Sequence, residues 1–126
     1  EIIKEDFVPV IVPMGLDEKG ISYNINADTA AGAVARSIKS RRLMLLTDID
    51  GVLDNNEKLI SEINTIEAKE LINNEVIHGG MIPKVKTCID AINNGVRAVV
   101  IIDGRKPHSI LFELFSDKGS GTLIRK

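Results

Sequence analysis

The segment GVRAVVIIDGR, residues 95–105, decides the fold of this chain. Its centre, Val96–Ile102, is largely apolar and dominated by valine and isoleucine, which is typical of a strand buried on both faces. The glycine before it suits the end of a helix, and the run stops at the polar turn Asp103–Arg105. A buried strand that ends in a polar turn is typical of a parallel sheet, whose ligands lie beyond the carboxyl ends of its strands.

A second run of this kind, Leu43–Leu46, ends in the polar segment TDIDG, residues 47–51. Segments before, between and after these two apolar runs have the spacing or the end signals of helices. They predict helices over residues 27–38, 65–74, 81–94 and 108–115. Thr65 is expected to cap the second of these helices, and Pro107 to lie in the first turn of the last. Helices that alternate with buried strands indicate an α/β fold with a mainly parallel sheet.

Four shorter segments complete the expected fold. Residues 1–6 are interpreted as a helix end that leads into a buried strand at Phe7–Val12. Turn residues and alternation within 15–26 predict a hairpin, and the segment 58–63 alternates as well. The terminal GTLIRK, residues 121–126, is expected to be a last strand.

The composition excludes several classes of protein. The chain has 126 residues, 16 basic and 18 acidic, with no basic stripe, so we predict no nucleic-acid partner. No apolar run reaches the length of a membrane span, and no membrane role is predicted. The single cysteine, Cys88, excludes an internal disulfide and fits a cytoplasmic location. Because the chain begins with Glu1, we interpret it as a piece of a longer polypeptide.

The segment HGGMIPK, residues 78–84, combines two glycines, a helix start and Lys84. A lysine in the first helical turn faces the positive end of the helix dipole, which is unfavourable by about 0.3–1 kcal/mol unless an anion binds there. Exposed backbone N–H groups, a helix N-terminus and a lysine together form a phosphate site. The alternative is a solvated lysine after a turn, because GG-x₃-K is not a Walker motif.

The segment YNINADTAAGAVA, residues 23–35, leads from polar residues into a run of small ones. The small residues predict a helix that packs closely against another element. Asn26 suits the helix cap and Asp28 suits its first turn, which leaves Asn24 without a structural reason. The alternative interpretation is that these polar residues bind a substrate.

Three other candidate motifs do not indicate a metal site or a nucleophile. In TDIDGVLD, residues 47–54, the spacing of the aspartates and glycine does not fit a calcium loop. The two histidines, His78 and His108, have no metal-ligand spacing, so no metal site is predicted. Cys88 falls on the apolar side of its helix and is interpreted as packing.

Four stretches resemble, in order and spacing, the C-terminal half of the acetylglutamate kinases of the amino acid kinase family. They are YNINADTAAGAVA, LLTDIDGVLD, GGMIPKV, and VVIIDGRKPHSILFELF followed by GSGTLI. The resemblance implies a three-layer α/β sandwich of the carbamate kinase-like fold. It also implies that residues 1–126 form the C-terminal, ATP-binding half of the domain and that the N-terminal, substrate-binding half is absent.

The resemblance further implies a cytoplasmic enzyme of arginine biosynthesis. It would use ATP and Mg²⁺ to phosphorylate the side-chain carboxylate of N-acetyl-L-glutamate, and it would act as a homo-oligomer, a dimer or a hexamer. Mg²⁺ would be held mainly through the nucleotide phosphates, and this piece alone would be inactive. The matching positions are Lys84 and Asp28 for catalysis, Asn24 and Asn26 for substrate, and Thr47, Asp48, Gly80 and Met81 for the nucleotide.

The tail PHSILFELFSDKGSGT, residues 107–122, resembles that of arginine-inhibited members. The resemblance places an arginine-effector site at His108, Glu113, Gly119 and Gly121, whereas the structural alternative is an amphipathic surface helix with an exposed Glu113. Two other functions also stay open. One is an amino acid kinase with another acceptor, such as aspartate, carbamate or a nucleoside monophosphate. The other is a non-catalytic module that binds ATP or arginine.

Overall fold

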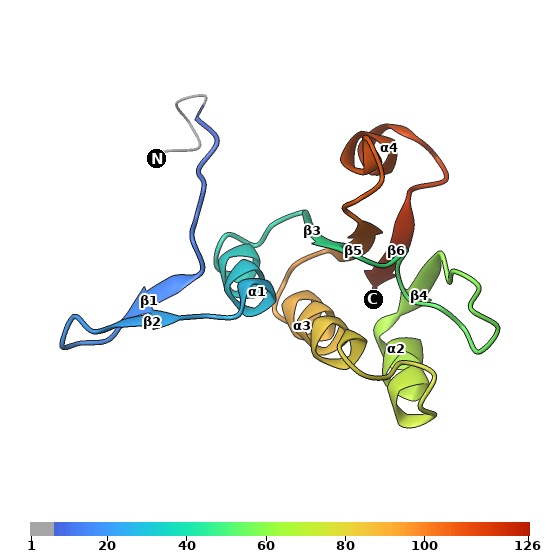
Figure 1. Ribbon diagram of the computed structural model, residues 1–126, viewed down its shortest axis with the longest axis horizontal. Helices are drawn as coiled ribbons and strands as arrows, with labels where there is room; N and C mark the ends of the chain where they lie inside the picture. The colour runs from blue at the N-terminus through green and yellow to red at the C-terminus, as the bar shows by residue number, and fades with distance from the viewer. Residues whose placement is uncertain (1–6) are drawn as a thin grey trace.

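The computed structural model describes residues 7–126, so the helix end expected at residues 1–6 lies outside the described residues. Ten elements follow one another along this part of the chain (Figure 1). They are β1 (Met14–Leu16), β2 (Ser22–Asn24), α1 (Ala27–Ser37), β3 (Arg42–Thr47), β4 (Glu62–Asn64), α2 (Thr65–Asn73), α3 (Met81–Asn93), β5 (Ala98–Asp103), α4 (Ser109–Phe115) and β6 (Gly121–Arg125).

A four-stranded sheet with the order β3-β5-β6-β4 forms the centre of the fold. Strands β3 and β5 are parallel, with Thr47 opposite Asp103, and β4 is parallel to β6. Strand β6 is antiparallel to β5, with Val99 opposite Ile124. The expected α/β fold is therefore confirmed, with one antiparallel pairing inside the sheet.

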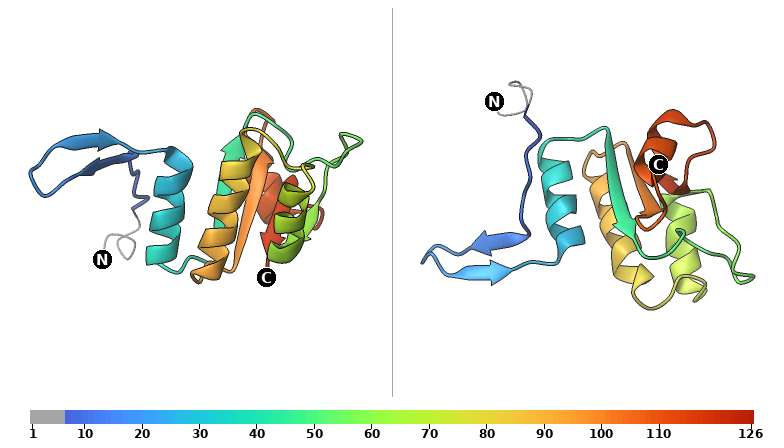
Figure 2. Two further views of the ribbon diagram at one scale, coloured as in Figure 1. Left: turned by 90° about the horizontal axis from the view of Figure 1, so that it is seen from below. Right: turned by 45° about the horizontal axis from the view of Figure 1, so that its top comes forward.

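Helices cover both faces of the sheet, which gives three layers. Figure 2 shows α1, α3 and α2 side by side on one face and α4 on the other. The core lies between α3 and the central strands, where Val85, Ile92, Val99, Ile101 and Ile124 are all at most 1% exposed. Burial of such aliphatic side chains stabilises the fold by about 25 cal/mol per Å² of apolar surface. No helix within residues 7–126 has both the length and the apolar character needed to cross a membrane.

The expected buried strand at Phe7–Val12 is wrong. These residues form no strand and are exposed, with Val10 at 91%. A strand needs a neighbour for its backbone hydrogen bonds, and no described strand pairs with this run. The apolar composition indicates a surface that another element can cover, but it does not say which. The expected hairpin does form, because β1 pairs antiparallel with β2.

Two expected helix starts shift by one residue. Asn64, not Thr65, caps α2: its Oδ1 accepts hydrogen bonds from the N–H groups of Ile66 and Glu67, at 2.8 and 2.9 Å. Helix α4 begins only at Ser109, because His108 adopts a left-handed backbone with φ of 60°. Pro107 therefore precedes the helix and does not lie in its first turn.

Candidate functional site

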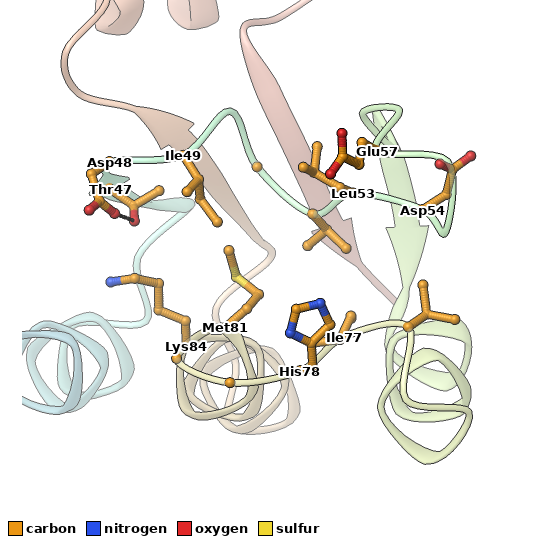
Figure 3. Close-up of a pocket in the computed structure, with 15 residues that line it drawn as sticks. Thr47, Asp48, Ile49, Leu53, Asp54, Glu57, Ile77, His78, Met81 and Lys84 are labelled. Carbon is orange, nitrogen blue, oxygen red and sulfur yellow. Dashed lines mark hydrogen bonds between the residues drawn. The ribbon is translucent and has the colours of Figure 1, made fainter.

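A cavity of about 540 Å³ opens beyond the carboxyl end of β3. This volume is within the range of small-molecule sites, which is about 300–1,000 Å³. The loop that follows β3 and the turn before α3 form its two walls (Figure 3). Five of the residues that the sequence singled out line this cavity together: Thr47, Asp48, Gly80, Met81 and Lys84.

Lys84 lies in the first turn of α3 and pairs with Asp28 from the first turn of α1. Its Nζ donates a hydrogen bond to the Asp28 Oδ2 at 2.7 Å. Both side chains are largely buried, at 21% and 24% exposed. The carboxylate offsets the unfavourable position of a lysine at a helix N-terminus, and it also holds the ammonium at one end of the cavity.

Close packing of α1 against α3 brings these two residues together. At Gly32, a Cβ atom would lie 2.9 Å from the Thr87 Cγ2, which is closer than real Cβ contacts come. Gly32 and Ala35 are the buried residues of α1, which confirms the expectation of close packing. Ala30 and Val34, on another side of this helix, line a separate groove beside Pro9, Ile11 and Pro13.

Asn26 serves as the cap of α1, as its structural interpretation predicted. Its Oδ1 accepts a hydrogen bond from the N–H of Thr29 at 3.1 Å. Asn24 ends β2 and is exposed. Neither asparagine lines the cavity, although both precede Asp28 closely in the chain. Their role in binding a substrate stays a prediction.

The turns after β3 and β5 contain charged residues that the sequence did not single out as a unit. Asp103 is 3% exposed, and the Arg105 guanidinium donates from Nε and Nη2 to its two carboxylate oxygens, each at 2.9 Å. These hydrogen bonds lower the pKa of Asp103 to about 2. Beside them, Lys106 pairs with Asp50 at 2.8 Å. The pairs stiffen the turns that lead into the cavity.

The middle of the cavity is lined by the His78 ring and by apolar side chains that were missed from the sequence (Figure 3). Val52, Leu53 and Ile77 line it between the Lys84 end and the residues Asp54 and Glu57. Ile77 has a weak sequence signal, since it directly precedes the HGG turn. The sequence around Val52 and Leu53 indicates only a loop and gives no sign that they line a cavity.

Cys88 is completely buried, as expected for a packing residue. Burial raises the pKa of its thiol to about 12, and the nearby carboxylate of Asp28 adds to this increase. The neutral thiol is therefore no nucleophile.

A second, smaller cavity of about 270 Å³ contains Glu113, Gly119 and Gly121, but not His108. The Glu113 side chain is only 8% exposed, so the alternative of an exposed glutamate is wrong. Its carboxylate accepts hydrogen bonds from the Arg42 Nη1 at 3.3 Å and from the N–H of Ser120 at 3.0 Å. His108 is exposed, directly precedes α4 and does not line this cavity.

Comparison with known proteins places this geometry in context. Residues 1–103 match the model of the amino acid kinase family. The chain is 64% identical over its whole length to an acetylglutamate kinase of Pelagibacter ubique (strain HTCC1062) and covers 44% of that protein. It is 55% identical over 120 residues to an acetylglutamate kinase of Rhodospirillum rubrum and covers 39% of it. The chain thus spans about two fifths of the length of these relatives.

Two solved structures have the same fold. An N-acetylglutamate synthase from Neisseria gonorrhoeae, complexed with coenzyme A and L-arginine, superposes with a TM-score of 0.85 at 30% identity. The match covers 90% of this chain and 26% of that one. A carbamate kinase from Giardia lamblia, bound to citric acid, gives a TM-score of 0.70 at 27% identity, with 90% of this chain and 36% of that one covered.

Proposed function

The chain belongs to the amino acid kinase family, and from this premise we propose that it supplies the nucleotide-binding half of an acetylglutamate kinase. The complete enzyme would phosphorylate the side-chain carboxylate of N-acetyl-L-glutamate with ATP, as a step of arginine biosynthesis in the cytoplasm. The main support for this proposal is the ion pair of Lys84 with Asp28. Lys84 lines a cavity together with Thr47, Asp48, Gly80 and Met81. The names of the relatives support the choice of acceptor.

The geometry suits phosphoryl transfer, which depends mostly on positioning and charge neutralisation. The carboxylate oxygen attacks the γ-phosphorus, an acyl phosphate forms, and the bond to the leaving ADP oxygen breaks. Attacker and donor are both anionic, so the Lys84 ammonium would reduce their repulsion and stabilise the charge on the phosphates. Asp28 would act by holding that ammonium in place.

Mg²⁺ fits this site as a partner of the nucleotide. No group of three or more histidine, cysteine or carboxylate side chains within residues 7–126 is arranged to hold a metal ion. Mg²⁺ is commonly bound through substrate phosphates and water with one or two carboxylates, and Asp48 is a carboxylate that lines the cavity. When bound, the ion would neutralise phosphate charge. Assembly of the complete enzyme as a dimer or hexamer stays a prediction.

We expect the purified 126-residue chain to form no acetylglutamyl phosphate, and we expect activity when it is joined to the N-terminal part of the Pelagibacter relative. The reason is that the groups of the acceptor side would come from that other part. The acyl phosphate is trapped with hydroxylamine and measured as a hydroxamate. The joined protein without ATP is the control.

Three outcomes would contradict this proposal. Formation of acyl phosphate by the chain alone, at a rate like that of the joined protein, would refute its assignment as a half site. A joined protein that phosphorylates carbamate or aspartate, but not N-acetyl-L-glutamate, would favour the kinase with another acceptor. ATP binding without any transfer would favour the non-catalytic module.

A second role, binding of arginine as an effector, is favoured by the small cavity at Glu113. The Arg42 guanidinium already contacts this carboxylate, so the site has the chemistry that a guanidinium ligand requires. The Neisseria structure with L-arginine supports the idea by its name. Gly119 and Gly121 line the same cavity and would leave room for the ligand beside the carboxylate.

We expect L-arginine to inhibit the joined protein and Glu113→Gln to reduce its apparent affinity for arginine by about tenfold, because one charge-assisted hydrogen bond is weakened. Activity is titrated with L-arginine, and D-arginine serves as the control ligand. Activity that stays unchanged at all arginine concentrations would contradict the effector site.

A further inference from the structure

The cavity at the end of β3 has its one lining lysine, Lys84, at one end, and two acidic residues at the other. Figure 3 shows Lys84 near Thr47 and Asp48 at one end, and Asp54 and Glu57 at the other. Apolar side chains and the ring of His78 lie between the two ends. A ligand that fits along this cavity therefore has an anionic end, an apolar or flat middle and hydrogen-bond donors at its far end.

The two acidic residues of the far end differ in their availability. The Asp54 Oδ1 accepts hydrogen bonds from the N–H groups of Asn56 at 2.8 Å and Lys58 at 2.9 Å. This carboxylate therefore stabilises the loop that contains it. Asp54 also points away from the other labelled residues (Figure 3). No hydrogen bond or ion pair between residues 7–126 uses the carboxylate of Glu57. Glu57 is thus the free acceptor of this end.

The loop presents Glu57 in a fixed way. Its N–H donates to the Asp54 carbonyl oxygen at 3.0 Å, and the N–H of Asp54 donates to the carbonyl oxygen of Lys58 at 2.9 Å. Its backbone is left-handed, with φ of 59°, which is uncommon for a residue other than glycine. The hydrogen bonds on either side hold this conformation, and both Glu57 and Leu53 line the cavity.

We propose that Glu57 is a specificity-determining residue that accepts hydrogen bonds from the ribose hydroxyls of the nucleotide. The proposal rests on the proposed function, in which the phosphates lie at Lys84. The ribose and base then lie toward Glu57, where an ionised carboxylate accepts but cannot donate. Acidic side chains bind ribose hydroxyls in this manner in other nucleotide sites. The residue selects ribonucleotides over deoxyribonucleotides.

The test is calorimetric titration of the 126-residue chain with the magnesium complexes of ATP, 2′-deoxyATP, 3′-deoxyATP and inosine triphosphate. The unchanged chain is expected to bind ATP about tenfold more tightly than at least one of the two deoxy analogues, as the loss of a hydrogen bond to a charged group implies. In Glu57→Ala the ratio of the affinity for ATP to the affinity for that deoxy analogue is expected to fall to about one. Glu57→Gln keeps an acceptor oxygen, and it is expected to retain part of the preference.

Glu75→Gln is a matched control, because Glu75 is also an exposed glutamate with a left-handed backbone, at φ of 58°, and it does not line the cavity. It is expected to leave all four affinities unchanged. Circular dichroism verifies that each variant is folded.

Two outcomes overturn the proposal. If Glu57→Ala keeps the preference for ATP over both deoxy analogues, or changes only the ratio of ATP to inosine triphosphate, the residue does not bind ribose, while the nucleotide site stands. If the unchanged chain binds none of the four nucleotides, this inference fails together with the assignment of the cavity to a nucleotide.

Discussion

Replacing Lys84 by methionine is expected to reduce phosphoryl transfer by the joined protein about 100-fold to 1,000-fold. The substitution keeps the length of the side chain but removes the ammonium that faces the cavity. Loss of one preorganised group that stabilises transition-state charge has an effect of this size. It also leaves Asp28 without its partner, so a carboxylate remains beside the phosphates. The rate is measured by the hydroxamate assay at saturating ATP.

Lys86→Met is the matched control on the same helix. Lys86 is exposed and lines grooves between α3 and its neighbouring helices, away from the cavity. Its replacement is expected to change the rate less than about twofold, because an exposed charge distant from the reaction is screened by solvent. Equal losses for Lys84→Met and Lys86→Met would contradict a specific role for Lys84.

Asp28→Asn tests whether the carboxylate acts through Lys84. The single substitution is expected to lower the rate by less than Lys84→Met, because an unheld ammonium still reaches the cavity in part of the population. The double variant is expected to be no slower than Lys84→Met alone, since residues that act as a unit are not additive. Additive losses would show that Asp28 acts independently of Lys84.

The substitution Gly121→Ala is expected to reduce the free energy of unfolding by about 3 kcal/mol, at the upper end of the usual cost of overpacking. A Cβ at this position would lie 2.0 Å from the carbonyl oxygen of Ile101, which belongs to the adjacent central strand. Backbone atoms cannot move aside as a flexible side chain can. The backbone hydrogen bonds between β5 and β6 would have to lengthen or break. The packing of Ile124, which is completely buried on β6, would be disturbed as well.

Urea unfolding of the chain, followed by circular dichroism, measures this effect as a shift of the midpoint at constant m-value. Gly80→Ala is the control, because a Cβ there meets no atom within 4 Å and the backbone φ is −67°. We expect the control to change stability by less than about 1 kcal/mol. Similar midpoints for Gly121→Ala and the unchanged chain would contradict the close approach of the two strands.

Long elements with a strong pattern could be predicted from the sequence. The runs at 43–46 and 96–102 became β3 and β5 because they are apolar at nearly every position. The helix after Gly80 followed from its regular spacing of isoleucine and valine. The run at Phe7–Val12 misled for the same reason: hydrophobicity indicates a surface that can be covered, while a strand also needs a partner.

The candidate site was predictable in part. Thr47, Asp48, Gly80 and Met81 were predicted from the resemblance to the acetylglutamate kinases, and in the structure they line one cavity. The general rule for such sheets, that ligands lie beyond the carboxyl ends of the strands, agrees with the place of this cavity. Glu57 was missed because its loop has no periodic pattern. His108 was expected at the Glu113 site, but it directly precedes α4, is exposed and does not line that cavity.

By itself, the sequence determined the two central strands β3 and β5, the approximate positions of the four helices, and which turns carry polar groups. These features depend on neighbouring residues, whose spacing decides which face of an element avoids water. Only the tertiary structure decided which distant residues meet. Lys84 and Asp28 are separated by 56 positions, and Arg42 and Glu113 by 71. Such pairs form because the packing of α1 against α3, and of α4 against the sheet, sets distances that no local pattern encodes.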